Sequence, residues 1–294
     1  MSEHVVAVFG AGTMGHGIAQ VLAQGGYQVR LFDLDGALLE AAQGKVRQNL
    51  EGAVKRGKLE ADAVDQIMGR LVLCPDLDAA LGEATMVIEA IPERLELKKS
   101  VLSDALARQP KLQLVGTNTS SLPVTEIAQA TPAPERVIGL HFFNPVHISK
   151  LVEIVLGERT SDATKELGLE VVRAISKTPI VVNDAPGFAS SRLGLVLGLE
   201  SMRMLEQGVA GVEDIDQAME LGYRHPMGPL KTTDYVGLDV RLAIAEHLHR
   251  EVGEAFRPPL LLRRLVRAGK LGRKSGEGFY RWDDAGKCLG PALS

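Results

Sequence analysis

Short, nearly continuous apolar runs alternate with longer amphipathic segments as far as about Asn183. Such runs are typical of strands that helices cover on both faces, and they predict strands at His4–Gly10, Tyr27–Phe32, Leu71–Cys74, Met86–Ala90, Leu112–Gly116, Arg136–His141, Leu151–Leu156 and Pro179–Val182. The segments between them predict helices at Met14–Gln24, Ala37–Arg56, Glu93–Arg108 and Ala163–Ser176. Because strands alternate with helices, we expect an α/β fold with a parallel, doubly wound sheet.

The pattern changes after the segment Asp184-Ala185-Pro186-Gly187. Strand patterns become rare, and the apolar spacing predicts helices at Ser190–Gln207, Val212–Leu221, Thr232–Val252 and Leu260–Ala268. Proline and glycine commonly separate elements, so the boundary is expected there. We predict an α/β domain over residues 1–186 and a smaller, all-helical domain over residues 187–294.

Composition narrows the class of protein. The 294 residues are 45% hydrophobic and 24% charged, which excludes a disordered chain, a collagen-like fibre and a disulfide scaffold. The net charge of −4 gives no reason to expect a nucleic-acid partner, and no apolar run is long enough to span a membrane. The start, Met1–His4, lacks the basic and apolar regions of an export signal, and Cys74 and Cys288 suit free thiols in a reducing cytoplasm.

A glycine-rich turn stands between the first predicted strand and helix. Its sequence, GAGTMG, is a G-x-G-x-x-G pattern in which Gly10 allows a tight turn, Gly12 admits a diphosphate close to the backbone and Gly15 lets helix and strand pack closely. The diphosphate then meets the N–H groups at the start of a helix. We predict a dinucleotide site formed by Gly10, Gly12, Thr13, Met14 and Gly15.

Asp33 ends the second predicted strand, where a carboxylate can accept hydrogen bonds from the ribose hydroxyls of a dinucleotide. It would repel the 2′-phosphate of NADP, and the residues that follow it, Leu34 to Gly36, supply no arginine to bind that phosphate. NAD is therefore the expected cofactor. The alternative is that Asp33 only caps a helix or shapes a turn.

Three polar residues fall at the expected carboxyl end of the sheet, where ligands bind in folds of this class. Ser120 follows a strand and can donate to a substrate oxygen, and His141 ends a strand and can accept a hydroxyl proton near neutral pH. Glu153 interrupts the apolar run Leu151–Val155, and such a carboxylate is costly to bury unpaired, so we expect it to orient His141. Alternatively, Ser120 or Ser121 caps the helix predicted at Pro123–Ala130, His141 is structural, or Glu153 faces solvent.

The sequence resembles the L-3-hydroxyacyl-CoA dehydrogenases, especially the short bacterial 3-hydroxybutyryl-CoA type, over essentially its whole length. The resemblance rests on seven segments in the same order: VAVFGAGTMGHGIAQ, VIEAIPERLELK, TNTSSLPVTEIA, HFFNPVHISKLVEIV, DAPGF…R, HPMGPL and GRKSGEGFY. It implies a Rossmann-type amino-terminal domain, a helical carboxyl-terminal domain that forms a homodimer, and oxidation of a 3-hydroxyacyl-CoA by NAD. No metal is expected in the site.

The resemblance also implies roles for single residues. Ser120 and His141 bind the substrate's 3-oxygen, with His141 as base and Glu153 as its orienting partner, and the NAD site is lined by Asp33, Glu93, Lys98 and Asn144. Lys98 is alternatively a surface residue of its helix, and Asn144 alternatively forms a turn with Pro145.

Other residues are placed near the substrate by the resemblance. Lys55 and Lys58, with Arg56, lie where family members contact the CoA phosphates, although a charged helix end is commonly just solvated. Ser191 stands where the family usually has an asparagine that approaches the substrate carbonyl; the shorter serine hydroxyl leaves chain-length preference open.

Some features stay open on the sequence. The basic segment Arg257–Lys274 is either a solvated helix face or a phosphate or partner site. The chain is alternatively a dehydrogenase of a small hydroxy acid or sugar acid, or a non-catalytic NAD-binding protein.

Overall fold

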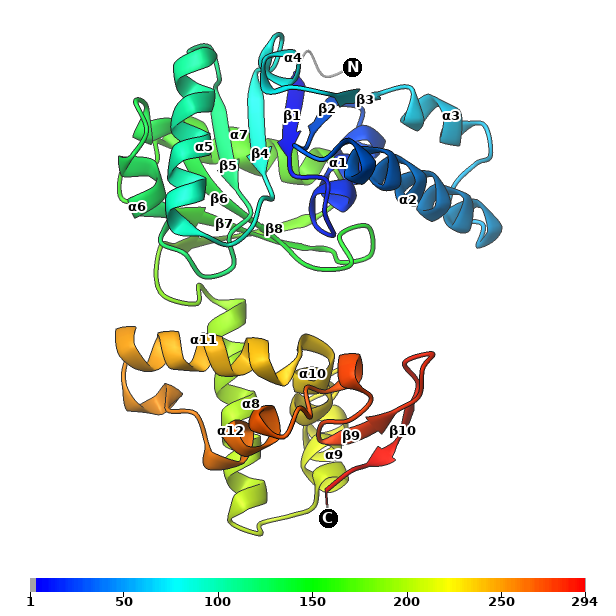
Figure 1. Cartoon of the computed structure of the whole chain (residues 1–294), viewed down its shortest axis with the longest axis vertical. Coiled ribbons are helices and arrows are strands. Elements are labelled where there is room, and N and C mark those ends of the chain that lie inside the picture. The colour runs from blue at the N-terminus through cyan, green and yellow to red at the C-terminus, as the bar shows by residue number, and fades with distance from the viewer. Residues whose placement is uncertain (1–3, 294) are drawn as a thin grey trace. The chain divides into compact units, whose positions relative to one another are not determined.

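The computed structural model describes residues 4–293, so Met1–Glu3, where no export signal is expected, lie outside the described residues. The chain divides into two compact units, one ending at Ala185 and the other beginning at Pro186 (Figure 1). The first unit holds a sheet of strands β1 Val5–Phe9, β2 Gln28–Phe32, β3 Leu71–Cys74, β4 Met86–Glu89, β5 Leu114–Thr117, β6 Val137–Phe142, β7 Leu151–Leu156 and β8 Thr178–Asn183. Its helices are α1 Gly15–Gln24, α2 Gly36–Lys55, α3 Ala63–Met68, α4 Leu77–Leu81, α5 Leu95–Arg108, α6 Val124–Gln129 and α7 Asp162–Ala174, with a 3₁₀ turn at Pro134–Arg136.

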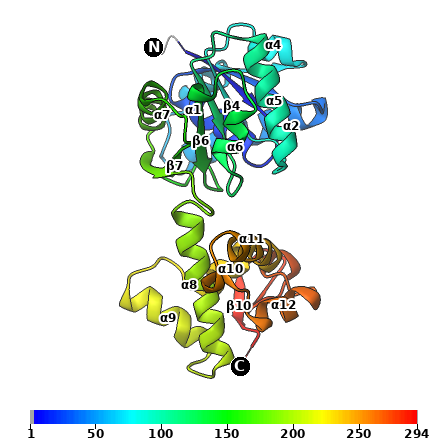
Figure 2. The ribbon, with the colours of Figure 1, turned by 90° about the vertical axis from the view of Figure 1, so that its left-hand side faces the viewer.

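The strand order of the sheet is β3-β2-β1-β4-β5-β6-β7-β8, the order of a doubly wound fold extended by two strands. Helices α1 and α7 lie on one face and share a core, while α5 and α6 lie on the other (Figure 2). Because both faces are covered, β1, β4 and β5 are almost wholly apolar and buried, which confirms the α/β prediction.

The sequence pattern predicted a parallel sheet, but one pair of strands is antiparallel. Strand β7 runs antiparallel to β6, and β8 runs parallel to β7. The segment from Phe143 to Lys150 that joins β6 to β7 is shorter than the dozen or more residues that a parallel crossover needs. The chain therefore turns back at the carboxyl end of β6, and β7 starts at the same edge of the sheet.

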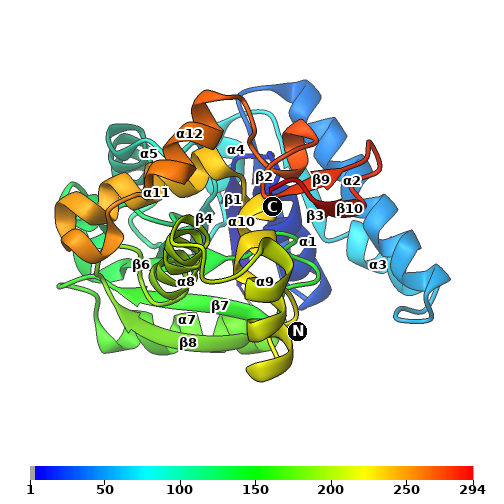
Figure 3. The ribbon, with the colours of Figure 1, turned by 90° about the horizontal axis from the view of Figure 1, so that it is seen from below.

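The second unit is helical, with α8 Ser190–Glu206, α9 Val212–Gly222, α10 Pro229–Val236, α11 Leu238–Glu251 and α12 Leu260–Arg267, and 3₁₀ turns at Glu254–Phe256 and Arg273–Ser275. Helix α10 packs against α8 and α9 (Figure 3). The unit also contains the antiparallel hairpin β9 Tyr280–Trp282 and β10 Cys288–Pro291, so "all-helical" was too strict.

The single helix predicted at Thr232–Val252 is wrong. Gly237 adopts φ of +100°, which ends α10 at Val236 and lets α11 begin at Leu238. A glycine inside a helical pattern is commonly tolerated, so the pattern alone did not reveal the break.

Candidate active site

The glycine turn has the geometry of a dinucleotide cradle. Gly10 has φ of +92°, and a methyl group added there would lie 2.7 Å from the carbonyl oxygen of Ala90. A methyl group on Gly15 would overlap the carbonyl of Gly10, so both glycines are required by close packing. Gly12 is exposed, and a methyl group built on it meets nothing within 4 Å. The space in front of Gly12, at the start of α1, fits a diphosphate.

Asp33 fastens this turn to the end of β2. Its Oδ2 accepts a hydrogen bond of 2.7 Å from the amide of Ala11, and its Oδ1 accepts one of 3.0 Å from the amide of Asp35. Helix α2 is capped by Asp35, whose carboxylate accepts a hydrogen bond from the amide of Ala37. The alternative that Asp33 caps the helix is therefore wrong, whereas the alternative that it shapes a turn agrees with its two backbone hydrogen bonds. Asp33 is only half-buried, and its oxygens have further lone pairs to offer ribose hydroxyls.

Lys98 is buried rather than on the surface, which corrects the second interpretation of that residue. It is 1% exposed, and its Nζ lies 2.8 Å from both carboxylate oxygens of Glu89, itself fully buried at the end of β4. Lys98 Nζ also lies 3.3 Å from Glu93 Oε2, and Thr117 on β5 donates to Glu89. Glu89 was missed by the sequence reasoning, although it ends an apolar run just as Glu153 interrupts one.

Glu93 organises the loop that carries Ser120. Its Oε1 accepts a hydrogen bond of 2.6 Å from the Thr119 hydroxyl and one of 2.9 Å from the Ser120 amide. The hydroxyls of Ser120 and Ser121 each lie 3.4 Å from the same oxygen. Neither serine caps α6, whose capping position is held by Pro123 without a side-chain hydrogen bond, so that alternative is wrong.

His141 and Glu153 lie opposite each other on the antiparallel strands β6 and β7. The Nδ1 of His141 lies 2.6 Å from Oε2 of Glu153, and both residues are buried. Glu153 therefore does not face solvent. His141 also lies against the ring of Phe143, with 4.4 Å between the ring centres. A buried imidazole–carboxylate pair of this kind fixes the tautomer and the orientation of the ring.

The glycine turn, Asp33, Glu89, Ser120 and His141 all follow or end strands that run in the same direction. Their side chains thus gather at one edge of the sheet, the carboxyl edge where ligands bind in doubly wound folds. The short antiparallel return brings Glu153 to the same edge.

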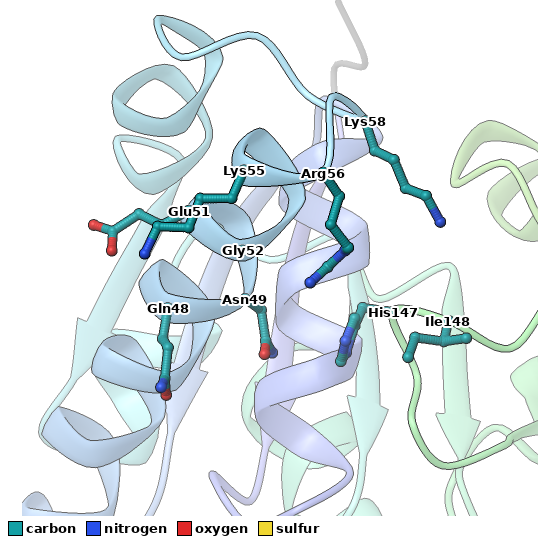
Figure 4. A pocket seen from close by; sticks show the side chains of 9 residues that line it. All are labelled: Gln48, Asn49, Glu51, Gly52, Lys55, Arg56, Lys58, His147 and Ile148. Carbon is teal, nitrogen blue, oxygen red and sulfur yellow. The ribbon is translucent and has the colours of Figure 1, made fainter.

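A hollow of about 580 Å³ lies beside the carboxyl end of α2, lined by Gln48, Asn49, Glu51, Gly52, Lys55, Arg56, Lys58, His147 and Ile148. In Figure 4, Arg56 and Lys58 extend toward the loop that bears His147, whereas Lys55 extends along α2 beside Glu51. Burial lowers the pKa of His147, and the nearby cationic groups of His16, Arg56 and Lys177 lower it further. Three cationic side chains, Lys55, Arg56 and Lys58, and one carboxylate, Glu51, line the hollow.

The remaining predicted residues occupy ordinary positions. Asn144 is exposed in a bend and forms a cis peptide bond with Pro145, which agrees with the turn interpretation. Ser191 lies half-buried in the first turn of α8. In the basic segment Arg257–Lys274, several cations pair with acids, among them Arg263 with Glu246 and Lys270 with Glu277, as a solvated helix face would.

Two family models together match nearly the whole chain. Residues 5–185 match the NAD-binding domain of 3-hydroxyacyl-CoA dehydrogenase, and residues 187–282 match the carboxyl-terminal domain of the same enzymes. The chain belongs to the 3-hydroxyacyl-CoA dehydrogenase family. It is accordingly an NAD-dependent oxidoreductase, and the predicted cofactor and fold class are confirmed.

Relatives of the family agree over the full length. A probable 3-hydroxybutyryl-CoA dehydrogenase of Deinococcus radiodurans is 41% identical over 94% of this chain and 99% of the relative. A 3-hydroxyadipyl-CoA dehydrogenase of Escherichia coli is also 41% identical, over 96% of this chain and 60% of the relative. The crystal structure of (S)-3-hydroxybutyryl-CoA dehydrogenase from Ralstonia eutropha superposes on this chain with a TM-score of 0.92 at 36% identity. The match covers 96% of this chain and 100% of the Ralstonia chain.

Two other kinds of feature are absent from the part of the chain that the structure describes. None of the helices in residues 4–293 is both long and apolar enough to cross a membrane. Over the same residues, no group of three or more histidine, cysteine, aspartate or glutamate side chains is arranged to hold a metal ion.

Proposed function

We propose that this dehydrogenase oxidises a short-chain L-3-hydroxyacyl-CoA, such as 3-hydroxybutyryl-CoA, to the 3-ketoacyl-CoA, with His141 as general acid and base. The observation that carries the proposal is the 2.6 Å contact between His141 Nδ1 and Glu153 Oε2 in a buried position at the carboxyl edge of the sheet. Two relatives of similar length are named "Probable 3-hydroxybutyryl-CoA dehydrogenase", which supports the short acyl chain.

The proposed chemistry follows from the pair. With Glu153 ionised, Nδ1 of His141 carries a hydrogen and donates a hydrogen bond to the carboxylate. Nε2 is then the unprotonated nitrogen and accepts the substrate's hydroxyl proton. Glu153 then stabilises the imidazolium that forms. Ser120, held by Glu93, donates its hydroxyl to the 3-oxygen as the carbonyl develops. Bound NAD supplies the acceptor for the hydride that leaves C3.

The cofactor is proposed to lie along the carboxyl edge of the first unit. The diphosphate faces Gly12 and the start of α1, and the adenosine ribose faces Asp33. Glu93, Lys98 and Asn144 line the site farther along. For Lys98 the support is indirect, because its ammonium already contacts Glu89 and Glu93, so it acts by fixing those carboxylates.

The CoA phosphates are proposed to bind the hollow beside α2. Lys55, Arg56 and Lys58 all line it, and Arg56 and Lys58 extend toward the loop that bears His147 (Figure 4). Phosphate groups pair well with such cations. Loss of affinity for CoA, with unchanged affinity for NADH, is the expected result of replacing Lys58 by Ala.

A homodimer formed through the second unit is also proposed. Large hydrophobic side chains are exposed along this unit, on α8, α9, α10, α11 and α12, including Leu193, Leu221, Tyr223, Tyr235 and Leu260. A contiguous patch of exposed apolar side chains is typical of an interface, so we propose that part of this set is buried in the dimer.

The two free cysteines, Cys74 and Cys288, are compatible with the cytoplasm as the place of action.

One assay separates this function from its rivals. Purified protein should oxidise NADH when acetoacetyl-CoA is added, and should not do so with acetoacetate or with small 3-keto acids that lack the thioester. Turnover of the free acids instead would identify a hydroxy-acid or sugar-acid dehydrogenase. Tight NADH binding without turnover of any 3-ketoacyl-CoA would identify a non-catalytic NAD-binding protein.

A further inference from the structure

The loop between β6 and β7 forms one wall of the hollow beside α2. His147 and Ile148 are the loop residues that line the hollow (Figure 4). Val146, just before them, is 2% exposed and packs against α1, where a methyl group built on Gly17 would lie 2.7 Å from the Cβ of Val146. The wall is therefore seated on α1 at its amino-terminal end.

A buried lysine holds the backbone at both ends of this wall. The Nζ of Lys177, just before β8, donates a hydrogen bond of 2.6 Å to the carbonyl oxygen of Val146 and another to that of Ser149. These two carbonyls stand on either side of the lining pair His147–Ile148 in the sequence. Hydrogen bonds from a charged donor are stronger than neutral ones, so a single side chain fixes the wall on both sides.

Lys177 occupies a costly position for a cation. It is 9% exposed, and burial alone lowers its pKa, because no acidic group among the described residues offsets the loss of water. A buried ammonium is costly unless hydrogen bonds compensate it, and here the acceptors belong to a loop rather than to a carboxylate. The side chain lies close to the hollow, since its charge is one of those that lower the pKa of His147.

We propose that Lys177 is a positioning residue that fixes the loop wall of the hollow and thereby raises the affinity for the phosphates of CoA. The proposal rests on the proposed function, in which those phosphates bind in the hollow. Arg56 and Lys58 extend toward this wall, so a bound phosphate needs the wall in one place (Figure 4). A loop that samples several positions binds only while it is in the competent one, and its apparent affinity falls by that fraction.

Two thioesters that differ in their phosphates separate this role from general damage to the enzyme. Acetoacetyl-CoA carries the phosphates, and S-acetoacetylpantetheine lacks them. Lys177→Met removes the ammonium and should lower the ratio of kcat/KM for acetoacetyl-CoA to kcat/KM for S-acetoacetylpantetheine by roughly ten-fold. Lys177→Arg keeps a charged donor and should retain part of the ratio. Lys150→Met, at an exposed position of the same loop, should leave the ratio unchanged.

A second measurement needs no turnover. By calorimetry, the affinity for CoA itself should fall roughly ten-fold in Lys177→Met and stay unchanged in Lys150→Met. If Lys177→Met does not fold, Lys177→Gln takes its place in both measurements. Its amide still donates to a carbonyl oxygen but carries no charge, so the expected fall is smaller, about three-fold.

Each outcome supports or overturns the proposal. A ratio that Lys177→Met leaves unchanged overturns it while the proposed function stands, as does an equal loss on both thioesters or a fall of similar size in Lys150→Met. If the unmodified protein reduces neither thioester, the proposed function fails. Calorimetry with CoA then decides the role of Lys177 by itself, because an affinity that survives Lys177→Met, or an unmodified protein that does not bind CoA, overturns the proposal.

Discussion

His141 owes its proposed reactivity to a carboxylate twelve positions along the chain, because the short return between β6 and β7 places Glu153 directly across from it. We expect His141→Gln to lower kcat for acetoacetyl-CoA reduction by roughly 10²–10⁴-fold, the usual worth of a general acid–base group, with NADH affinity nearly unchanged. Glu153→Gln should lower kcat by at least about 10²-fold, because a wrong tautomer is then stabilised. Steady-state kinetics and NADH titration measure both effects.

A matched control for that pair is Glu158→Gln, an exposed carboxylate just beyond β7 that should leave kcat unaltered. Retention of more than about a tenth of kcat in His141→Gln would rule out its role as base.

Asp33 is proposed to set the preference for NAD over NADP through its charge. Asp33→Asn removes the negative charge and keeps an oxygen that can accept from the amide of Ala11. We expect the preference for NADH over NADPH, measured as the ratio of kcat/KM values, to narrow by roughly ten-fold or more, since a like charge beside the 2′-phosphate is removed. Equal kcat/KM for the two cofactors in the unmodified protein would contradict the assignment.

At the scale of elements, Glu89 and Lys98 join the end of β4 to the first turns of α5, with Thr117 of β5 as a third member. We expect Glu89→Gln to lower the free energy of unfolding by about 3–5 kcal/mol, the usual cost of leaving one partner of a buried pair uncompensated. Denaturant unfolding measures the change. Adding Lys98→Met should recover part of the loss, and a double-variant effect equal to the sum of the single effects would show that the pair is not coupled.

The elements themselves were largely predictable from the sequence. Strands such as β3 and β7 are read directly from apolar runs, and their ends agree with the structure. The antiparallel direction of β7 and the helix break at Gly237 were not predicted, because hydrophobic periodicity carries neither strand direction nor the sign of φ.

The site was predictable where a polar residue interrupts an apolar run. Glu153 was found in this way. Glu89 carries the same pattern inside the predicted strand Met86–Ala90 but was overlooked. The burial of Lys98 was not readable, since a lysine on a helix is normally exposed and only the fold supplies its two carboxylates.

For the whole molecule, we expect a dimer in solution whose interface lies on the second unit. Leu221 and Tyr223, at and beyond the end of α9, are 78% and 75% exposed. Replacing both with Lys should shift the sedimentation coefficient to that of a monomer, because charges are depleted at interface cores. Leu34→Lys serves as the control, since Leu34 is 94% exposed on the first unit and should not affect assembly. A monomeric unmodified protein, or a dimer that persists in the double variant, would contradict this interface.

The bond from the Ala11 amide to Asp33 Oδ2 has a consequence for redesign of coenzyme preference. The carboxylate that would discriminate against NADP also fixes the backbone on which the diphosphate of either coenzyme would rest. Replacing Asp33 by Ala, Ser or Arg to admit NADP would also remove the carboxylate that accepts the hydrogen bond from the Ala11 amide. The change in specificity would therefore be accompanied by lower affinity for either coenzyme. Successful conversion therefore requires a second change that restores an acceptor to Ala11, and natural chains with the opposite preference should carry such a substitute near the end of β2.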